Sequence, residues 1–277
     1  MLESPMKIRS ALLAATMAAF LASVPRAEDA TVASPRIRTK HAAPAAASAP
    51  GAPSAVDSAP APDSEIIDAP TSAVLDDHAY STRSRFYSQG GLLEYLSFGV
   101  YPGVNLGVSA AVDSLIGDQK SVRVRAPNAQ IKWRFFEGDQ VLPSLAVGYD
   151  GQGYGYNTTI QRFNQRQRGF YLVGTKELGV PGLQIHPSFN ISDFNSNAIF
   201  GSLPLTLNIR DRAEILLEWD NIANWSASRF NAGLRVFLTS NFHVDFAVRA
   251  IGAGGDYSDG APKGPERIVQ LKYSNSF

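Results

Sequence analysis

The sequence offers few residues that could carry out chemistry. Among 277 residues there are four histidines and no cysteine. The lack of cysteine excludes disulfides, thiolate metal sites, cysteine nucleophiles and a lipid-modified N-terminal cysteine. His186 and His243 fall on the polar side of alternating segments, whereas His41 and His78 lie in or beside a Pro-rich stretch. A Ser–His–acid site on His186 or His243 is one alternative, but no G-x-S-x-G is present, so we predict polar structural histidines and no catalytic residue.

Two glycine-rich stretches resemble ligand-binding loops but lack their context. GQGYGY (Gly151–Tyr156) has the glycines of a phosphate loop, yet no helical pattern follows it. GAGGDYSDG (Gly252–Gly260) could offer Asp256 and Asp259 to calcium, yet it lacks the spacing of a calcium loop. EWDN around Trp219 contains a WD dipeptide without any blade repeat. We interpret these stretches as external loops and a strand end, and we predict no cofactor and no metal site.

Four charged residues in the last third of the chain could form a row of ion pairs. A three-residue turn at Thr239–Asn241 would place Arg235 opposite Asp245, and the preceding hairpin would place Glu214 on the other side of Arg235. Lys272 would then lie beside Asp245. Charges withdrawn from water need partners of opposite sign, so we predict the row Glu214–Arg235–Asp245–Lys272 inside the fold. Separate solvated charges are the alternative.

Long alternating segments would position these residues. In NAQIKWRFFEG, Ile131 and Trp133 alternate with Lys132 and Arg134. Such segments run to about ten residues, which exceeds the usual soluble strand and suits a tilted strand that crosses a bilayer. We predict twelve strands, near residues 79–88, 91–100, 104–113, 127–137, 141–150, 168–178, 182–192, 197–208, 212–220, 229–238, 242–251 and 266–277.

The connections alternate between short turns and generally longer polar or Gly-rich loops. Short turns are predicted at Tyr101–Val104, Glu137–Gln140, Gly179–Gly182, Ile209–Asp211 and Thr239–Asn241. Short turns at one end and long loops at the other are typical of outer-membrane proteins, and an even strand number places both termini in the periplasm. We therefore predict an all-β fold, a transmembrane antiparallel up-and-down β-barrel. A secreted β-sandwich, whose strands also alternate, is the alternative.

The last strand, ERIVQLKYSNSF, carries a possible signal for insertion. Val269, Leu271, Tyr273 and Phe277 alternate with polar residues and end on an aromatic residue. Barrel assembly machinery recognises such an ending, although its usual aromatic two residues before the end is Asn275 here. We predict that the apolar side of this strand faces lipid. Interfacial aromatic girdles would also be expected, with these candidate members: Trp133, Tyr149, Tyr171, Trp219 and Tyr273.

The N-terminal part has a different composition. Lys7 and Arg9 precede the short apolar stretch ALLAATMAAFLAS, as in a signal peptide for export. Residues 28–78 are dominated by Ala, Pro and Ser, and such a stretch buries too little apolar area to order itself. We predict a signal peptide over 1–27, a disordered periplasmic spacer over 28–78 and an outer-membrane barrel over 79–277.

Several stretches resemble the YjbH-like group of outer-membrane barrel proteins, which are linked to exopolysaccharide production in Gram-negative bacteria. They include RFYSQGGLLEYLSFGVYPGVNLGVS, PSLAVGYDGQGYG, GFYLVGTKELGVPGLQIHPSFN, LLEWDN and RFNAGLRVFLT, within residues 85–238. These are strand and turn motifs without a catalytic signature. The resemblance implies an envelope role near polysaccharide secretion, and it implies no activity. The group's better-known members are larger and often lipoproteins, from which this cysteine-free chain departs.

These observations predict a non-enzymatic outer-membrane barrel with an envelope role, accessory to exopolysaccharide production or export. A narrow diffusion pore for small solutes is the alternative, and a barrel enzyme comes third. Twelve tilted strands give a radius of about 12 Å, so the lumen should be narrow or blocked. Expected partners are outer-membrane lipid, barrel assembly machinery and, from the resemblance, polysaccharide or export components. With 25 basic and 25 acidic residues, nucleic acid is not an expected partner.

Overall fold

The computed structural model describes residues 63–117, 121–157, 161–165, 169–191, 199–222, 228–253 and 263–277. They belong to one compact unit, Asp57–Phe277. The predicted signal peptide, most of the predicted spacer and most of the Gly252–Gly260 loop lie outside the described residues. Within the described ranges, no helix is long and apolar enough to span a membrane.

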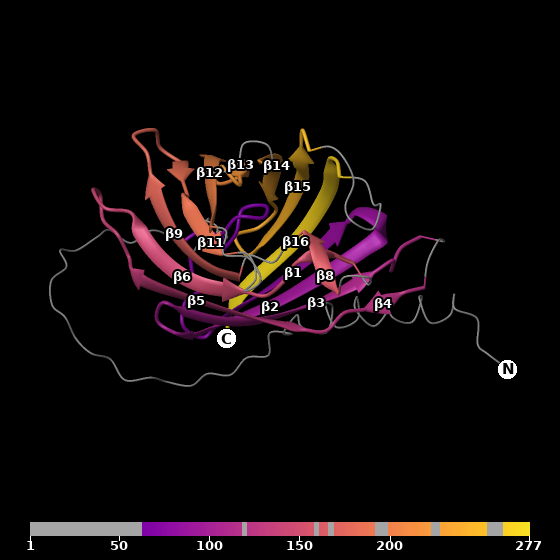
Figure 1. The fold of residues 1–277 in the computed structure, drawn as a ribbon. Helices are drawn as coiled ribbons and strands as arrows, with labels where there is room; N and C mark the ends of the chain where they lie inside the picture. The colour runs from indigo at the N-terminus through magenta and orange to yellow at the C-terminus, as the bar shows by residue number, and fades with distance from the viewer. Residues whose placement is uncertain are drawn as a thin grey trace, which may run out of the picture. The chain divides into compact units, whose positions relative to one another are not determined.

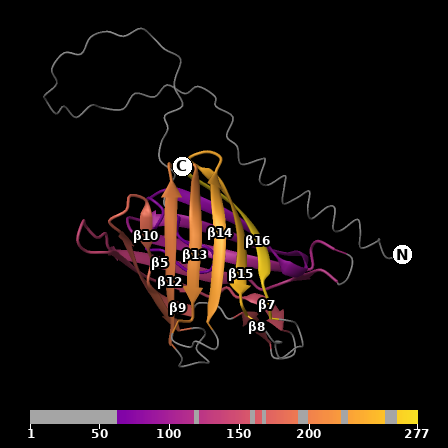
Figure 2. The same cartoon turned by 90° about the horizontal axis from the view of Figure 1, so that it is seen from above.

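The chain forms a closed antiparallel barrel (Figure 1). Its spanning strands are β1 (Ala79–Tyr87), β2 (Gly91–Tyr101), β3 (Val104–Asp113), β5 (Asn128–Phe136), β6 (Ser144–Asp150), β9 (Gly169–Glu177), β10 (Leu183–Ile185) with β11 (Ser188–Ile191), β12 (Ile199–Ile209), β13 (Ala213–Asp220), β14 (Arg229–Phe237), β15 (Phe242–Ile251) and β16 (Glu266–Ser276). Neighbours in sequence pair around the ring, and β1 closes it by pairing with β16. Strands β12 to β16 run side by side along one wall (Figure 2).

The sheet contains fourteen strands, and thirteen of them form the twelve crossings of the wall. The two-residue β4 (Arg123–Val124) only adds to β3, and β10 and β11 are two parts of one crossing, interrupted at His186 and Pro187. Proline has no N–H for the ladder, which accounts for the break. Outside the barrel wall are the short 3₁₀ helix η1 (Ser88–Gly90) and the two-stranded sheet of β7 (Tyr154–Asn157) and β8 (Arg162–Gln165). The prediction of a closed twelve-stranded antiparallel barrel is confirmed.

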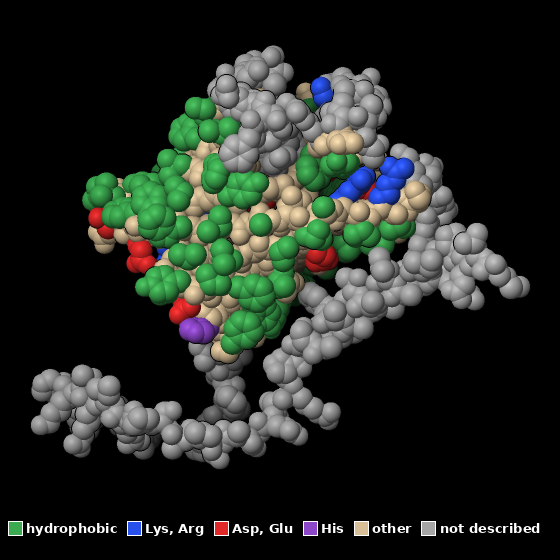
Figure 3. All heavy atoms as spheres, turned by 60° about the horizontal axis from the view of Figure 1, so that its bottom comes forward, with side chains coloured by type: hydrophobic (Ala, Val, Ile, Leu, Met, Phe, Trp, Pro, Cys, Tyr) green, Lys and Arg blue, Asp and Glu red, His purple; other side chains and the backbone are tan. Residues whose placement is uncertain are grey.

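The two faces of the wall follow the alternation in the sequence. On β16, Ile268, Gln270 and Lys272 are buried, whereas Val269 and Leu271 between them are only half-buried. Large apolar side chains cover much of the outer surface in view, and charged ones gather toward its edges (Figure 3). A polar lumen with an apolar exterior is the arrangement that a membrane barrel requires, because lipid cannot hydrate charges.

Glu94 is an exception on the outer face. It lies on β2 directly opposite Ser84 of β1, and both are on the face that carries Leu96. The Ser84 hydroxyl donates a hydrogen bond of 2.9 Å to Glu94 Oε2. The hydroxyl gives the carboxyl a local partner where solvent is scarce.

The core of the barrel includes a segment that precedes the first strand. Residues Asp63–Leu75, which we call the inner segment, lie inside the ring of strands (Figure 1). Ile66 and Ile67 are 1% and 0% exposed and pack against the inward-facing side chains of the wall, namely Leu216, Ala247 and Ile268. Burying each isoleucine stabilises the fold by about 1.5–3 kcal/mol. The expected boundary of the spacer at His78 is therefore wrong, because the part from Asp63 onward is packed into the lumen.

Candidate functional site

The inner segment folds as a small hairpin. The backbone N–H of Thr71 donates to Ser64 O at 3.1 Å, and that of Ile66 donates to Ala69 O at 3.0 Å, which closes a tight turn. The hairpin forms no ladder with any barrel strand in the described residues; its only bridge joins Glu65 and Pro70. The wall holds it through side chains.

The tip of the hairpin rests on one carboxylate. Glu218 Oε1 accepts hydrogen bonds from the backbone N–H groups of Ile67 at 2.7 Å, Asp68 at 2.9 Å and Ala69 at 2.9 Å. Asn231 donates to the other oxygen of Glu218 at 2.7 Å. A carboxyl oxygen accepts hydrogen bonds, so Glu218 satisfies the N–H groups that a turn leaves without partners.

The hairpin has a defined direction. Glu218, at its tip, is close to the end of β13 that leads into the long connection to β14. At the other end, Ser72 Oγ lies 2.5 Å from Ser144 Oγ, and the Ser72 N–H donates to Thr175 Oγ1 at 2.9 Å, close to the short turns. The hairpin therefore extends from the short-turn end of the barrel toward the long-loop end.

Near the tip, two arginines hold one acidic side chain of the segment. Asp68 Oδ1 is 2.6 Å from Arg85 Nη2, and Asp68 Oδ2 is 2.9 Å from Arg249 Nε. Burial alone would raise the pKa of Asp68, but the charges of Arg249 and Arg85 outweigh it and hold that pKa well below its usual value. The carboxylate is therefore ionised between the two guanidinium groups. Arg85 also donates to Ile67 O at 2.8 Å.

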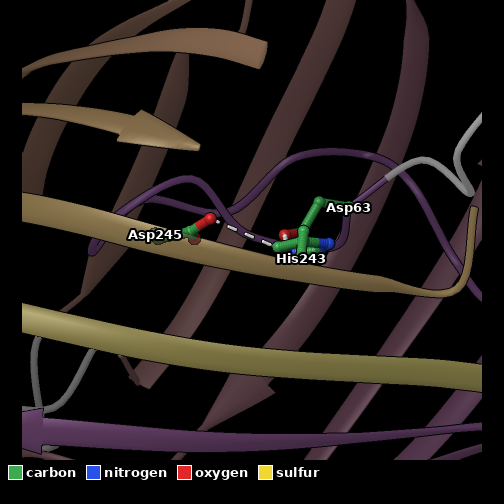
Figure 4. A group of neighbouring side chains, drawn as sticks. All are labelled: Asp63, His243 and Asp245. Atoms are coloured by element: carbon green, nitrogen blue, oxygen red, sulfur yellow. Dashed lines mark hydrogen bonds and ion pairs between the residues drawn. The ribbon is translucent and has the colours of Figure 1, made fainter. Parts of the chain in front are cut away.

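A second cluster surrounds Asp63 nearer the short turns (Figure 4). Asp63 forms ion pairs with Arg235, at 2.7 Å, and with Lys272. His243 Nε2 lies 3.1 Å from Asp63 Oδ2 and 3.8 Å from Asp245 Oδ1. These three residues, Asp63, His243 and Asp245, have donor atoms suited to a metal ion, but Arg235 and Lys272 already bring positive charge to the same carboxylates. We interpret the cluster as an ion-pair network.

The structure brings together three of the four residues of the predicted charge row. Arg235 lies opposite Glu214 on one side and Asp245 on the other, with ion pairs of 3.0 and 2.8 Å. Lys272 lies opposite His243, while Gln270 takes the place opposite Asp245. The acid that pairs with Lys272 is Asp63 of the inner segment. Because a long loop joins β15 to β16, the register of these two strands could not be inferred from the sequence.

Two further basic contacts were not predicted from the sequence. Lys132 Nζ donates to three backbone carbonyls of the segment, Ser64 at 2.6 Å, Thr71 at 3.2 Å and Ala73 at 3.2 Å. Arg83 forms an ion pair with Glu65. One feature of the sequence could have indicated that this segment is packed inside the barrel. The stretch DSEIID places acids and two adjacent isoleucines inside an Ala- and Pro-rich region.

The other sequence candidates do not form a catalytic or phosphate site. His186 is buried, and its ring nitrogens lie 3.0 Å from Thr175 Oγ1 and 3.3 Å from Thr206 Oγ1, which are hydroxyls and not acids. Gly151–Tyr156 leads into β7 and not into a helix. Tyr171, expected in an aromatic girdle, instead points inward and is 7% exposed, whereas Trp133 is 52% exposed on the outer face.

The inner segment occupies part of the lumen, and a small cavity borders it. A cavity of about 40 Å³ remains beside it, with Ser64, Glu65, Arg83, Tyr95 and Lys132 among its lining residues. A site needs roughly 10–15 Å³ for each water, so this space holds a few waters and no solute of the size of a sugar.

The fold and the occupied lumen define a class: a closed, twelve-stranded antiparallel β-barrel that holds a segment of its own chain inside the ring. No known family model and no curated protein matches the chain. Among solved structures, a KdgM porin is similar at 12% identity and a TM-score of 0.44, over 72% of this chain and 99% of that one. A KdgM porin in complex with disordered oligogalacturonate has 10% identity and a TM-score of 0.44, again over 72% and 99%. A NanC porin has 8% identity and a TM-score of 0.40 over the same shares. TM-scores below 0.5 support neither a family assignment nor a ligand.

Proposed function

We propose that the protein is a non-enzymatic outer-membrane channel for small solutes, kept closed by its own inner segment. The observation that carries this proposal is that the occupant of the lumen is separate from the wall. Because no ladder hydrogen bond joins the hairpin to a barrel strand within the described ranges, its withdrawal would leave the twelve-stranded ring intact. The wall behind it is polar and charged, as a water-filled passage requires.

The character of the contacts also supports a removable occupant. Most of them are ion pairs and hydrogen bonds between polar side chains of the wall and the segment, which water can replace when the segment leaves. The apolar part is small, with Ile66 and Ile67 against three wall residues. A barrel that served only as a scaffold would have no need of a charged wall around a separate hairpin.

A second candidate is the envelope role without conduction that the sequence favoured. The inner segment inside the ring, bordered by a cavity of only about 40 Å³, is the observation in its favour. Under this alternative the barrel would be an accessory of exopolysaccharide production or export, as the resemblance to the YjbH-like group implies. The C-terminus and the start of β1 would face the periplasm in either case, since Asn241 of a short turn accepts from Ser274 and Phe277 donates to His78.

A reversible tether tests the channel proposal. The hydroxyls of Ser72 and Ser144 are 2.5 Å apart, the chain has no native cysteine, and Ser→Cys changes little volume, so Ser72→Cys with Ser144→Cys should form a disulfide. The disulfide prevents the segment from withdrawing as a unit. In planar lipid bilayers we expect opening events with the reduced protein, their loss on oxidation and their return on reduction.

The matched control is Ser72→Cys with Leu145→Cys, because Leu145 is the next residue of β6 and points to the outer face. This pair should neither cross-link nor change conductance with redox state. Equal conductance in the cross-linked and reduced forms would contradict closure by the segment. No conductance in any form would favour the non-conducting envelope role.

A further inference from the structure

We propose that the lumen is a binding site for a linear solute that carries several carboxylates, and that the inner segment occupies this site as a stand-in for it. This inference rests on the proposed channel function and names the class of its solute. It begins with the composition of the stretch: residues 63–77, DSEIIDAPTSAVLDD, hold five acidic residues and no basic one.

Each acidic side chain of the segment that enters the lumen meets basic groups of the wall. Asp68 lies between Arg85 and Arg249, and Glu65 pairs with Arg83. Asp63 pairs with Arg235 and Lys272. Three carboxylates thus contact five basic side chains, which come from β1, β14, β15 and β16. A guanidinium group presents a fork of donors that matches a carboxylate, so these contacts would recognise the same group on a solute.

The basic groups are arranged along the passage and not gathered at one point. Arg85 and Arg249 lie toward the same end of the barrel, where β1 leads into η1 and β15 leads into the long connection to β16, and Arg235 and Lys272 lie toward the short-turn ends of β14 and β16. We call these the outer clamp and the inner clamp. Two carboxylate clamps in series fit an extended molecule that carries acidic groups at intervals, and a compact monovalent anion would use only one.

Withdrawal of the segment would make the net charge of the side chains that line the passage more positive. It would remove three carboxylates from among the five basic side chains, while three carboxylates of the wall remain, Glu214 and Asp245 on Arg235 and Glu266 on Arg249. In a narrow passage with low-dielectric walls, such an excess of positive charge concentrates anions and excludes cations. Lys132, freed from three carbonyls, would add a further donor.

The test uses the full chain with the carboxylates of the segment neutralised, Asp63→Asn with Glu65→Gln and Asp68→Asn. Heat-modifiable migration on a gel first establishes that the barrel has assembled. In bilayers we expect more frequent opening, anion over cation selectivity, and block by tetraglutamate at concentrations about tenfold lower than by the neutral, shape-matched tetraglutamine. Adding Arg85→Gln with Arg249→Gln, which removes the outer clamp, should abolish this difference.

Failure of this inference and failure of the channel proposal give different results. If the assembled variant conducts but prefers cations, or is blocked equally by both peptides, the inference is overturned and the channel stands. If it does not conduct, thermal stability tests the inference. A higher melting temperature with tetraglutamate than with tetraglutamine supports the binding site, and equal melting temperatures overturn it. Should the triple variant fail to assemble, Asp68→Asn alone replaces it, and tetraglutamate must restore the lost melting temperature more than tetraglutamine does.

Discussion

Two residues of the wall, Lys132 and Glu218, bind the backbone of the hairpin. The ammonium group of Lys132 has three donors and meets three carbonyls, while the carboxylate of Glu218 meets three consecutive N–H groups. A charged group placed on backbone atoms recognises the course of a chain whatever its side chains are. These two residues therefore fix where the hairpin lies, whereas the arginines recognise its acidic side chains.

Glu218→Gln tests the role of the carboxylate. The amide keeps one acceptor oxygen but loses the charge, and its NH₂ group cannot accept from the turn. Hydrogen bonds to a charged group contribute about 1.5–3 kcal/mol, so the tip should loosen by an amount of this order. Hydrogen exchange at Ile67, Asp68 and Ala69 should become faster, with no change in the strands. The control is Glu137→Gln, because the side chain of Glu137 is 84% exposed in a turn. If hydrogen exchange at the tip were as slow in Glu218→Gln as in the wild type, the proposed role of Glu218 in holding the tip would be contradicted.

At the scale of the element, the strands are where sequence and structure agree best. All twelve expected strands are present, because alternation reports directly which side chains face lipid and which face the lumen. The short turn at Thr239–Asn241 fixes the register of β14 and β15, so Arg235 and Asp245 are opposed as expected. Where a long loop joins β15 to β16, turn length gives no register, and Lys272 is displaced from its expected neighbour.

The last strand carries a prediction about assembly. Phe277 is 83% exposed; its ring lies 5.1 Å from that of Tyr80, and its N–H donates to His78 O at 2.9 Å. Few contacts are lost when so exposed a residue is removed. Deletion of Phe277 should therefore lower the amount of barrel in the outer membrane, if the C-terminal aromatic acts as an insertion signal, while the melting temperature of the barrels that do assemble changes little. Immunoblots of outer-membrane fractions measure the first quantity, and the temperature of heat-modifiable migration measures the second. Unchanged amounts would contradict the insertion signal formed by Val269, Leu271, Tyr273 and Phe277.

At the scale of the whole molecule, the inner segment is what the sequence did not disclose. The disorder prediction for residues 28–78 used their average composition, which is rich in Ala and Pro. The six residues DSEIID differ from that average but are too few to change it. Their partners come from strands more than a hundred residues away in some cases, such as Glu218 and Arg249. A local pattern cannot report contacts of that range, because the partners meet only after the ring has closed. Local alternation in the sequence therefore determines which side chains face outward, whereas the contacts inside the lumen depend on residues that meet only in the assembled barrel.

This division predicts different consequences for two deletions on the N-terminal side of β1. Removing residues 63–75 should still allow a barrel to assemble, because the ladder that closes the ring uses none of them. It should lower the free energy of unfolding by about 3–6 kcal/mol, since Ile66 and Ile67 no longer bury their side chains against Leu216, Ala247 and Ile268. Removing residues 28–62, whose Ala, Pro and Ser composition predicts no packed core, should leave the melting temperature unchanged. Heat-modifiable migration of both variants beside the wild type measures the difference. Equal melting temperatures for the two deletions would mean that the hairpin does not stabilise the barrel, and would remove the physical basis for a lumen that the chain itself keeps closed.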